Sequence, residues 1–138
     1  MPERILAAID LRTSTCTDPI LDTAIAVVTR RRARLTVLNV ITEPDPCLPG
    51  IQQEHMRQED LEAMENMRAP GVLPTTVCAV IDRPAWHYIA KLSKQRPTDL
   101  VVIGAVERRN GQDGPGANAA ELLTHLPRPV MAVWPPPL

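Results

Sequence analysis

The sequence predicts one α/β domain in which a mostly parallel five-stranded sheet lies between two layers of helices. Three observations predict it. Five short apolar runs rich in Val and Ile recur along the chain, at residues 5–9, 35–41, 76–81, 100–103 and 130–134. They are nearly continuous rather than alternating, as in strands buried on both faces. The segments between them have helical periodicity, so the order is βαβαβαβαβ.

A chain of 138 residues has the size of a single domain, and no linker or repeat divides it, so we expect one domain over residues 1–138. The first strand, residues 5–9, follows the N-terminus almost at once and leaves no room for a signal peptide. We therefore expect a cytoplasmic protein.

The first helix is expected between the first two strands. Asp18 is a good N-cap, and Pro19 suits the first helical position. Three arginines, residues 30–32, match the negative end of the helix dipole, which is our interpretation of this basic cluster. One apolar stripe has the spacing i, i+3, i+4, i+7: Leu21, Ala24, Ile25 and Val28.

A second helix is expected within residues 52–67, where Leu61, Met64 and Met67 form a partial stripe beside a highly charged face. The third helix follows Pro84 and ends before Pro97. Its apolar face consists of Ala85, Tyr88, Ile89 and Leu92.

A fourth helix precedes the last strand. Asn118 is its expected N-cap, and Glu121 follows at the spacing of a capping box. Its apolar face consists of Ala119, Leu122, Leu123 and Leu126. The two longest irregular stretches are expected at residues 43–50 and 107–116.

Composition excludes several function classes. The net charge is −1, so a nucleic acid or an anionic membrane would meet no large basic surface. With no Phe, two Trp and one Tyr, the chain has few rings with which to stack a flavin or a base. Three widely spaced cysteines predict neither a disulfide framework nor a zinc site. We therefore expect no nucleic-acid partner, no membrane partner and no metal site.

In a doubly wound sheet the ligand crevice lies beyond the carboxyl ends of the strands, where the strand order reverses. The residues at those ends are Asp10, Val40, Asp82 and Gly104. Asp10 can accept hydrogen bonds from a ribose hydroxyl or an amino group, or it can cap the following turn. Local sequence favours neither role.

Several segments together resemble the universal stress protein family over almost the whole chain. They are R-I-L-A-A-I-D at residues 4–10, R-L-T-V-L-N-V at 34–40, V-I-D-R-P-A at 80–85, D-L-V-V-I-G at 99–104 and A-N-A-A-E-L-L-T-H-L-P-R-P-V-M-A-V at 117–133. The last two segments, with their spacing, are the most specific.

The resemblance implies strand order 3-2-1-4-5 and, in some members, a site for ATP or AMP, with magnesium, between the first and fourth strands. Carried over, Asp10 lies near the ribose or adenine, while Ala8 and Val40 line the adenine slot. Ile103 precedes Gly104, the first glycine of the nucleotide loop. Further candidates at the phosphate end are Arg108, Asn118 and Ala119.

This chain departs from the loop pattern of nucleotide-binding members, which is G-x-x-G, nine residues, then G and a small polar residue. Glu107 stands at the second glycine position and Ala117 at the third, while Asn118 keeps the small polar one. A carboxylate ~5 Å from a phosphate charge is repelled by ~3 kcal/mol at an effective dielectric constant of ~20. Glu107 could instead turn to solvent or pair with Arg108, so both a lost site and a retained one stay open.

Two functions remain. One is a dimeric stress-response or signalling protein that acts through contacts with unknown proteins and has a weakened or lost nucleotide site. The other is a sensor that binds ATP or AMP. We expect no enzyme: the chain has no G-x-x-x-x-G-K-[ST] motif and nothing identifies a catalytic base, although the resemblance leaves slow ATP hydrolysis open.

The last strand, from Pro129 to Trp134, is the expected dimer contact. It has the character of an apolar edge strand and is followed by three prolines, residues 135–137. An exposed apolar edge invites pairing, and pairing with a second copy would bury it. The alternative is that the prolines only protect the edge.

Overall fold

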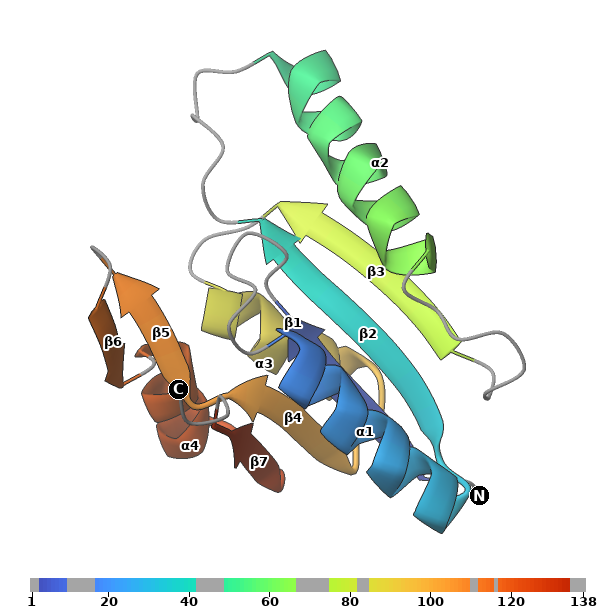
Figure 1. Ribbon diagram of the computed structural model, residues 1–138, viewed down its shortest axis with the longest axis vertical. Coiled ribbons are helices and arrows are strands. Elements are labelled where there is room, and N and C mark those ends of the chain that lie inside the picture. Colours follow the sequence, from blue (N-terminus) through green and yellow to red (C-terminus); the bar gives the residue numbers. More distant parts are fainter. Residues whose placement is uncertain are drawn as a thin grey trace.

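The computed structural model of the protein describes residues 3–9, 17–41, 49–66, 75–81, 85–109, 112–115 and 117–134. Its main sheet has the order β3-β2-β1-β4-β7, with every neighbouring pair parallel. The strands are β1 (Arg4–Ile9), β2 (Arg34–Ile41), β3 (Thr75–Ile81), β4 (Leu100–Gly104) and β7 (Val130–Val133). When only the five strands of the main sheet are numbered along the chain, this is the expected order 3-2-1-4-5 (Figure 1). It confirms the predicted fold class.

Four helices connect the strands, as expected. They are α1 (Thr17–Arg31), α2 (Gly50–Asn66), α3 (Ala85–Gln95) and α4 (Ala117–His125). None of the helices in the described part of the chain is both long enough and apolar enough to cross a membrane.

The sheet has one apolar core on each face, which makes the fold three-layered. Against one face pack α1, through residues such as Ala24 and Val28, and α2, through Met64. Against the other pack α3, through Ile89, and α4, through Leu122. Alternate residues of the strands feed the two cores, because successive side chains of a strand point to opposite faces.

The arginine cluster lies at the end of α1, as expected, and closes that helix. Arg32 has a φ of 53°, and the amide of Ala33 donates to the carbonyl oxygen of Val28 over 3.0 Å. This is the bond pattern of a Schellman motif, in which the residue after the helix turns left-handed. Ala33 and Val28 are both buried, so the motif also directs the chain into β2.

Three details differ from the sequence-based expectation. The described residues of the expected irregular stretch 107–116 belong to strands: β5 (Val106–Arg109) pairs antiparallel with β6 (Gln112–Pro115), and this hairpin follows β4. Helix α4 begins at Ala117, so Asn118 lies within its first turn rather than at the N-cap. Likewise α1 begins at Thr17, one residue before the expected cap at Asp18. The ends of helices fray, so a helix begins within a residue or two of the position that its capping residue indicates.

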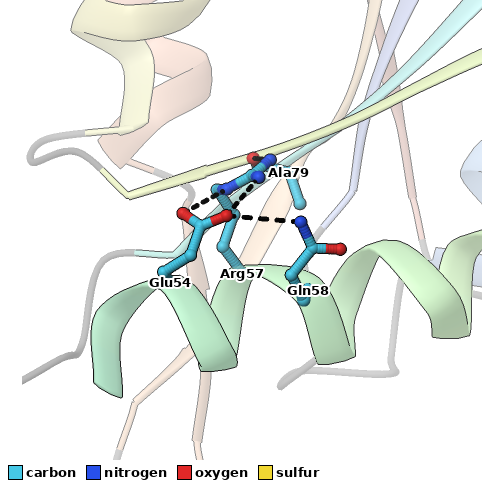
Figure 2. A network of polar contacts seen from close by, with 4 residues as sticks. All are labelled: Glu54, Arg57, Gln58 and Ala79. Carbon is cyan, nitrogen blue, oxygen red and sulfur yellow. Dashed lines mark hydrogen bonds and ion pairs between the residues drawn. The ribbon is translucent and has the colours of Figure 1, made fainter. Parts of the chain in front are cut away.

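Helix α2 lies along β3 at one side of the sheet (Figure 1) and is held there largely by polar contacts. Asn39 of β2 is buried, and its Nδ2 donates to Oδ2 of Asp60 on α2 over 2.8 Å. Arg57 extends from α2 to the carbonyl oxygen of Ala79 on β3 at 3.4 Å (Figure 2). Buried polar groups need such partners, so these contacts fix where α2 lies.

The Arg57 side chain is itself held by Glu54. Its Nε and Nη2 donate to the two carboxylate oxygens over 3.0 and 2.6 Å, and Gln58 donates to the same carboxylate (Figure 2). These hydrogen bonds, first that from Arg57 and then that from Gln58, lower the pKa of Glu54 from 4.5 to about 2. The guanidinium is thereby oriented toward β3.

Candidate functional site

The strand order reverses between β1 and β4. The chain leaves β1 through α1 toward β2 and β3, and it returns through α3 to β4 on the other side of β1. Ligands of doubly wound sheets bind at such a point, beyond the carboxyl ends of the two strands. The ladder pairs Ile5 with Leu100 and Ala7 with Val102, so the end of β4 lies beside the end of β1.

The structure brings four of the predicted residues together on one face of the sheet. Val40, Ile103 and Ala119 are buried in the core beneath α3 and α4, and Ala8 packs against it while staying half-buried. Ala8 pairs with Leu38, which places Val40 two residues further along the same face of β2. Together they form an apolar wall at the carboxyl edge.

Gly104 is the last residue of β4 and pairs with Val133 of β7. The amide of the next residue, Ala105, donates to the Val133 carbonyl oxygen over 2.8 Å. Strand pairing with β7 therefore continues just past the glycine, and the β5–β6 hairpin begins from there.

The structure describes less of the polar residues of the predicted site than of the apolar ones. Asp10 and Asp82 lie outside the described residues. Arg108 belongs to β5 and Asn118 to the first turn of α4, and only their backbones are described. The first amides of α4 have no acceptors within the helix, so an anion could still bind at its N-terminus.

The hairpin changes what the loop after β4 can offer a phosphate. Glu107 pairs with Gly114, and Arg108 pairs with Asp113, in an antiparallel ladder. In such a ladder, backbone amides in hydrogen-bonded pairs donate to the opposite strand. Those amides are not available to surround a phosphate.

An aromatic contact between α3 and α4 was not predicted. Trp86 stacks on His125 with ring centroids 5.3 Å apart and an angle of 19° between the planes. Nε2 of His125 also lies 3.0 Å from a carboxylate oxygen of Glu121. A tryptophan and a histidine almost forty residues apart carry no sequence signal of their contact.

The three histidines and the two groups with shifted pKa values all lie on helices. The three histidines, at positions 55, 87 and 125, lie on α2, α3 and α4 and are exposed. Among the described residues, no three His, Cys, Asp or Glu side chains gather closely enough to hold a metal ion. The shifted pKa values of Glu54 and Arg57 belong to α2, not to the crevice.

The sequence was compared with protein-family models and with curated proteins. Residues 1–133 match the model of the Universal stress protein family. No curated protein matches the sequence.

Solved structures with the same fold include the universal stress protein UspA from Lactobacillus plantarum, with a TM-score of 0.76, 23% identity and coverage of 95% of this chain and 97% of that one. A protein of the universal stress protein family from Burkholderia pseudomallei has a TM-score of 0.70 and 20% identity, and the match covers 95% of both chains. The universal stress protein from Archaeoglobus fulgidus in complex with dAMP has a TM-score of 0.62 and 15% identity, and the match covers 95% of this chain and 97% of that one.

Proposed function

The chain belongs to the universal stress protein family, and on that premise we propose that it is a homodimeric interaction module of the stress response whose nucleotide crevice is weakened or lost. Dimerisation would occur through β7, the last strand of the sheet. Proteins of unknown identity would be the partners of the dimer. The free thiol of Cys78 on β3 suits a reducing compartment, so we place the protein in the cytoplasm.

The open edge at β7 is the observation that carries the proposal. β7 has β4 on one side and no strand of the described chain on the other. Trp134 is 68% exposed and Met131 is 36% exposed, and both belong to this edge. Leu123 on the adjoining α4 is exposed as well. Unpaired backbone groups beside large apolar side chains favour the addition of a strand from a second copy.

The loop after β4 supports a weakened nucleotide site. Glu107 replaces a glycine of the family pattern and adds a negative charge where phosphates would lie. The backbone of the same residue is committed to the β5–β6 hairpin. Both changes oppose a triphosphate, one through charge and one through the loss of free amides.

Oligomeric state and nucleotide binding can be tested separately. Multi-angle light scattering should give twice the monomer mass of 15.2 kDa, and a monomer over the whole concentration range would refute the dimer. Calorimetry with ATP and with AMP, each with magnesium, should show no micromolar binding. A thermal midpoint unchanged by ATP would agree, because a ligand that binds only the folded state must raise it.

A paired variant makes the nucleotide test sharper. Replacing Glu107 and Ala117 by glycine restores the family pattern, and we expect it to strengthen ATP binding by roughly a hundredfold. The matched control is Glu62→Gly on α2, which removes a carboxylate far from the crevice. If the restored pattern bound no better than the control, charge and glycine would not be what weakens the site.

A second candidate function is an ATP or AMP sensor. It is favoured by the apolar wall of Ala8, Val40, Ile103 and Ala119. The nucleotide complex of the fold relative from Archaeoglobus fulgidus adds support. Micromolar binding by the unaltered chain, with chemical-shift changes at Gly104, would favour the sensor over the module.

A further inference from the structure

We propose that the amino edge of the sheet, opposite the nucleotide crevice, holds a second binding site for an organic phosphate ester. A cavity of about 420 Å³ opens there between the starts of β1, β2 and β3 and the end of α3. Three arginines from three elements line it: Arg4, Arg34 and Arg96. The volume is in the range of small-molecule sites.

The positions of Arg4 and Arg34 are the strongest indication of an anion. They pair directly across the β1–β2 ladder, so two guanidinium side chains start side by side on the same face of the sheet. Like charges opposite one another destabilise a sheet. A bound anion with two negative charges would turn this unfavourable pair into a favourable one.

The described acids near the cluster form no ion pair with it. Glu3 lies close, but its carboxylate pairs with Arg31 at 3.1 Å. Asp99 accepts the backbone amide of Arg4 over 2.8 Å. Within the described part of the chain, no carboxylate forms an ion pair with any of the three guanidinium groups that line the cavity.

A purely structural reason exists for Arg96 but not for the other two. Arg96 directly follows α3, where the helix dipole places about half a negative charge and favours a cation. Arg4 and Arg34 begin strands, which have no comparable dipole. Both arginines are exposed, and a bound anion would account for their direct pairing.

The rest of the lining indicates the kind of anion. Thr36 and Thr76 pair across the β2–β3 ladder and add hydroxyl donors beside the arginines. A planar guanidinium group can donate two parallel hydrogen bonds to two oxygens of one phosphate. Apolar side chains on the same face form the remainder of the wall, among them Leu6, Leu92 and Pro97. The cavity thus has a polar, basic part and an apolar part. A phosphate that carries a small apolar group can contact both parts, whereas a bare phosphate contacts only the first.

The test uses phenyl phosphate at low ionic strength, followed by amide chemical shifts of the full chain. We expect saturable shifts at Arg4, Arg34 and Thr98, and binding about tenfold tighter than for inorganic phosphate. Phenol, which lacks the charge, should not bind. Absence of saturable shifts at these residues, or shifts confined to Gly104 and Ala119 at the nucleotide crevice, would overturn the proposal.

Variants separate the site from general charge attraction. Arg34→Gln combined with Arg96→Gln should weaken phenyl phosphate binding at least about tenfold. The control Arg30→Gln removes an exposed arginine at the end of α1 and should change it less than about twofold. Equal weakening by both would refute a specific site.

The same double variant has a second readout that guards against misfolding. Because it removes like-charge repulsion at the β1–β2 ladder and also one favourable charge at the end of α3, its thermal midpoint without ligand should stay close to that of the unaltered chain. Its midpoint should no longer rise with phenyl phosphate. A midpoint that still rises would overturn the proposal, and neither result depends on whether nucleotides bind at the other edge.

Discussion

The two edge strands of the sheet, β3 and β7, are treated in opposite ways. β3 is flanked by α2, whose Arg57 reaches its backbone at Ala79 (Figures 1 and 2). The sequence of this helix is rich in charged residues. β7 is short and has exposed Trp134 and Met131 along its open side. Edge strands expose unpaired backbone groups, and proteins cover or charge those that must not pair.

This difference indicates at which edge of the sheet a second copy could add. A sheet with two open edges could add strands at both and grow without limit, whereas a sheet with one guarded edge can add a partner only at the other. Two copies that meet through β7 would form a closed pair related by a two-fold axis. The charged helix at β3 then has as much to do with assembly as the apolar strand at β7.

Proline substitutions at adjacent positions of β7 should have the largest and most divergent effects. The amides of Val101 and Ala105 donate to the carbonyl oxygens of Pro129 and Val133. By alternation Met131 also faces β4, and Ala132 presents its amide to the free edge. Met131→Pro should lower the free energy of unfolding by about 1–3 kcal/mol, because it removes a hydrogen bond of the β4–β7 ladder. Ala132→Pro should leave the fold intact and abolish the dimer.

Urea denaturation and light scattering would measure the two effects. Dimers of normal affinity in Ala132→Pro would show that pairing does not use the backbone of β7. Loss of folding in both variants would show that the alternation is wrong.

Replacement of Trp134 should weaken the dimer without unfolding the chain. Buried tryptophans at interfaces commonly contribute 2 kcal/mol or more, so Trp134→Ser should raise the dimer dissociation constant about thirtyfold. Ile51→Ser on α2 is the matched control, because Ile51 is equally apolar and even more exposed, but lies at the guarded side. Analytical ultracentrifugation would compare them, and similar dissociation constants would mean that exposure alone does not mark the interface.

Loss of the buried contact beneath α2 should have a moderate effect on stability. Asp60→Ala removes the acceptor that Asn39 uses at 2.8 Å, and it should cost about 1 kcal/mol of unfolding free energy. Glu62→Ala, on the exposed side of the same helix, should cost almost nothing. A chemical denaturation series would decide, and equal costs would show that the Asn39 contact does not secure α2.

The smallest effect is local and electrostatic. In Arg57→Gln the pKa of Glu54 should rise from about 2 toward its usual 4.5. Because the folded-state pKa is depressed, the stabilising contribution of this carboxylate is present above pH 4.5 and is lost as the pH falls toward 2. Carbon-detected NMR titration of the carboxyl group measures the change. A Glu54 pKa that stays near 2 without Arg57 would assign the shift to another group.

The sequence predicted the parallel sheet well because its strands are buried on both faces. Residues 100–103 are all apolar and residues 35–41 are mostly apolar, so few other structures could bury them. Helix ends were less predictable. Asn118 has the side chain of a cap, yet α4 begins one residue earlier, because the end of a helix is set by backbone geometry that the type of side chain does not fix.

The site was predicted where it depends on strand register and missed where it depends on contacts between distant segments. Ala8, Val40 and Ile103 follow from the topology, because parallel strands end at the same edge. The β5–β6 hairpin was missed because residues 106–115 lack the alternation of apolar and polar residues that marks a hairpin. Asn39 is an amide inside a mostly apolar strand, and this is the signal in the sequence that indicates the contact beneath α2.

Helix α2 has a further consequence for how the molecule opens. Its attachment depends on Asp60 and Arg57 and on little apolar surface, with Met64 as its buried core residue. Such an element can detach while the remaining layers stay folded, at a free energy well below that of global unfolding. Its amide protons should therefore exchange with solvent before those of α1 or α3. Salt should speed that exchange, because added ions screen the charges that hold the helix against the sheet.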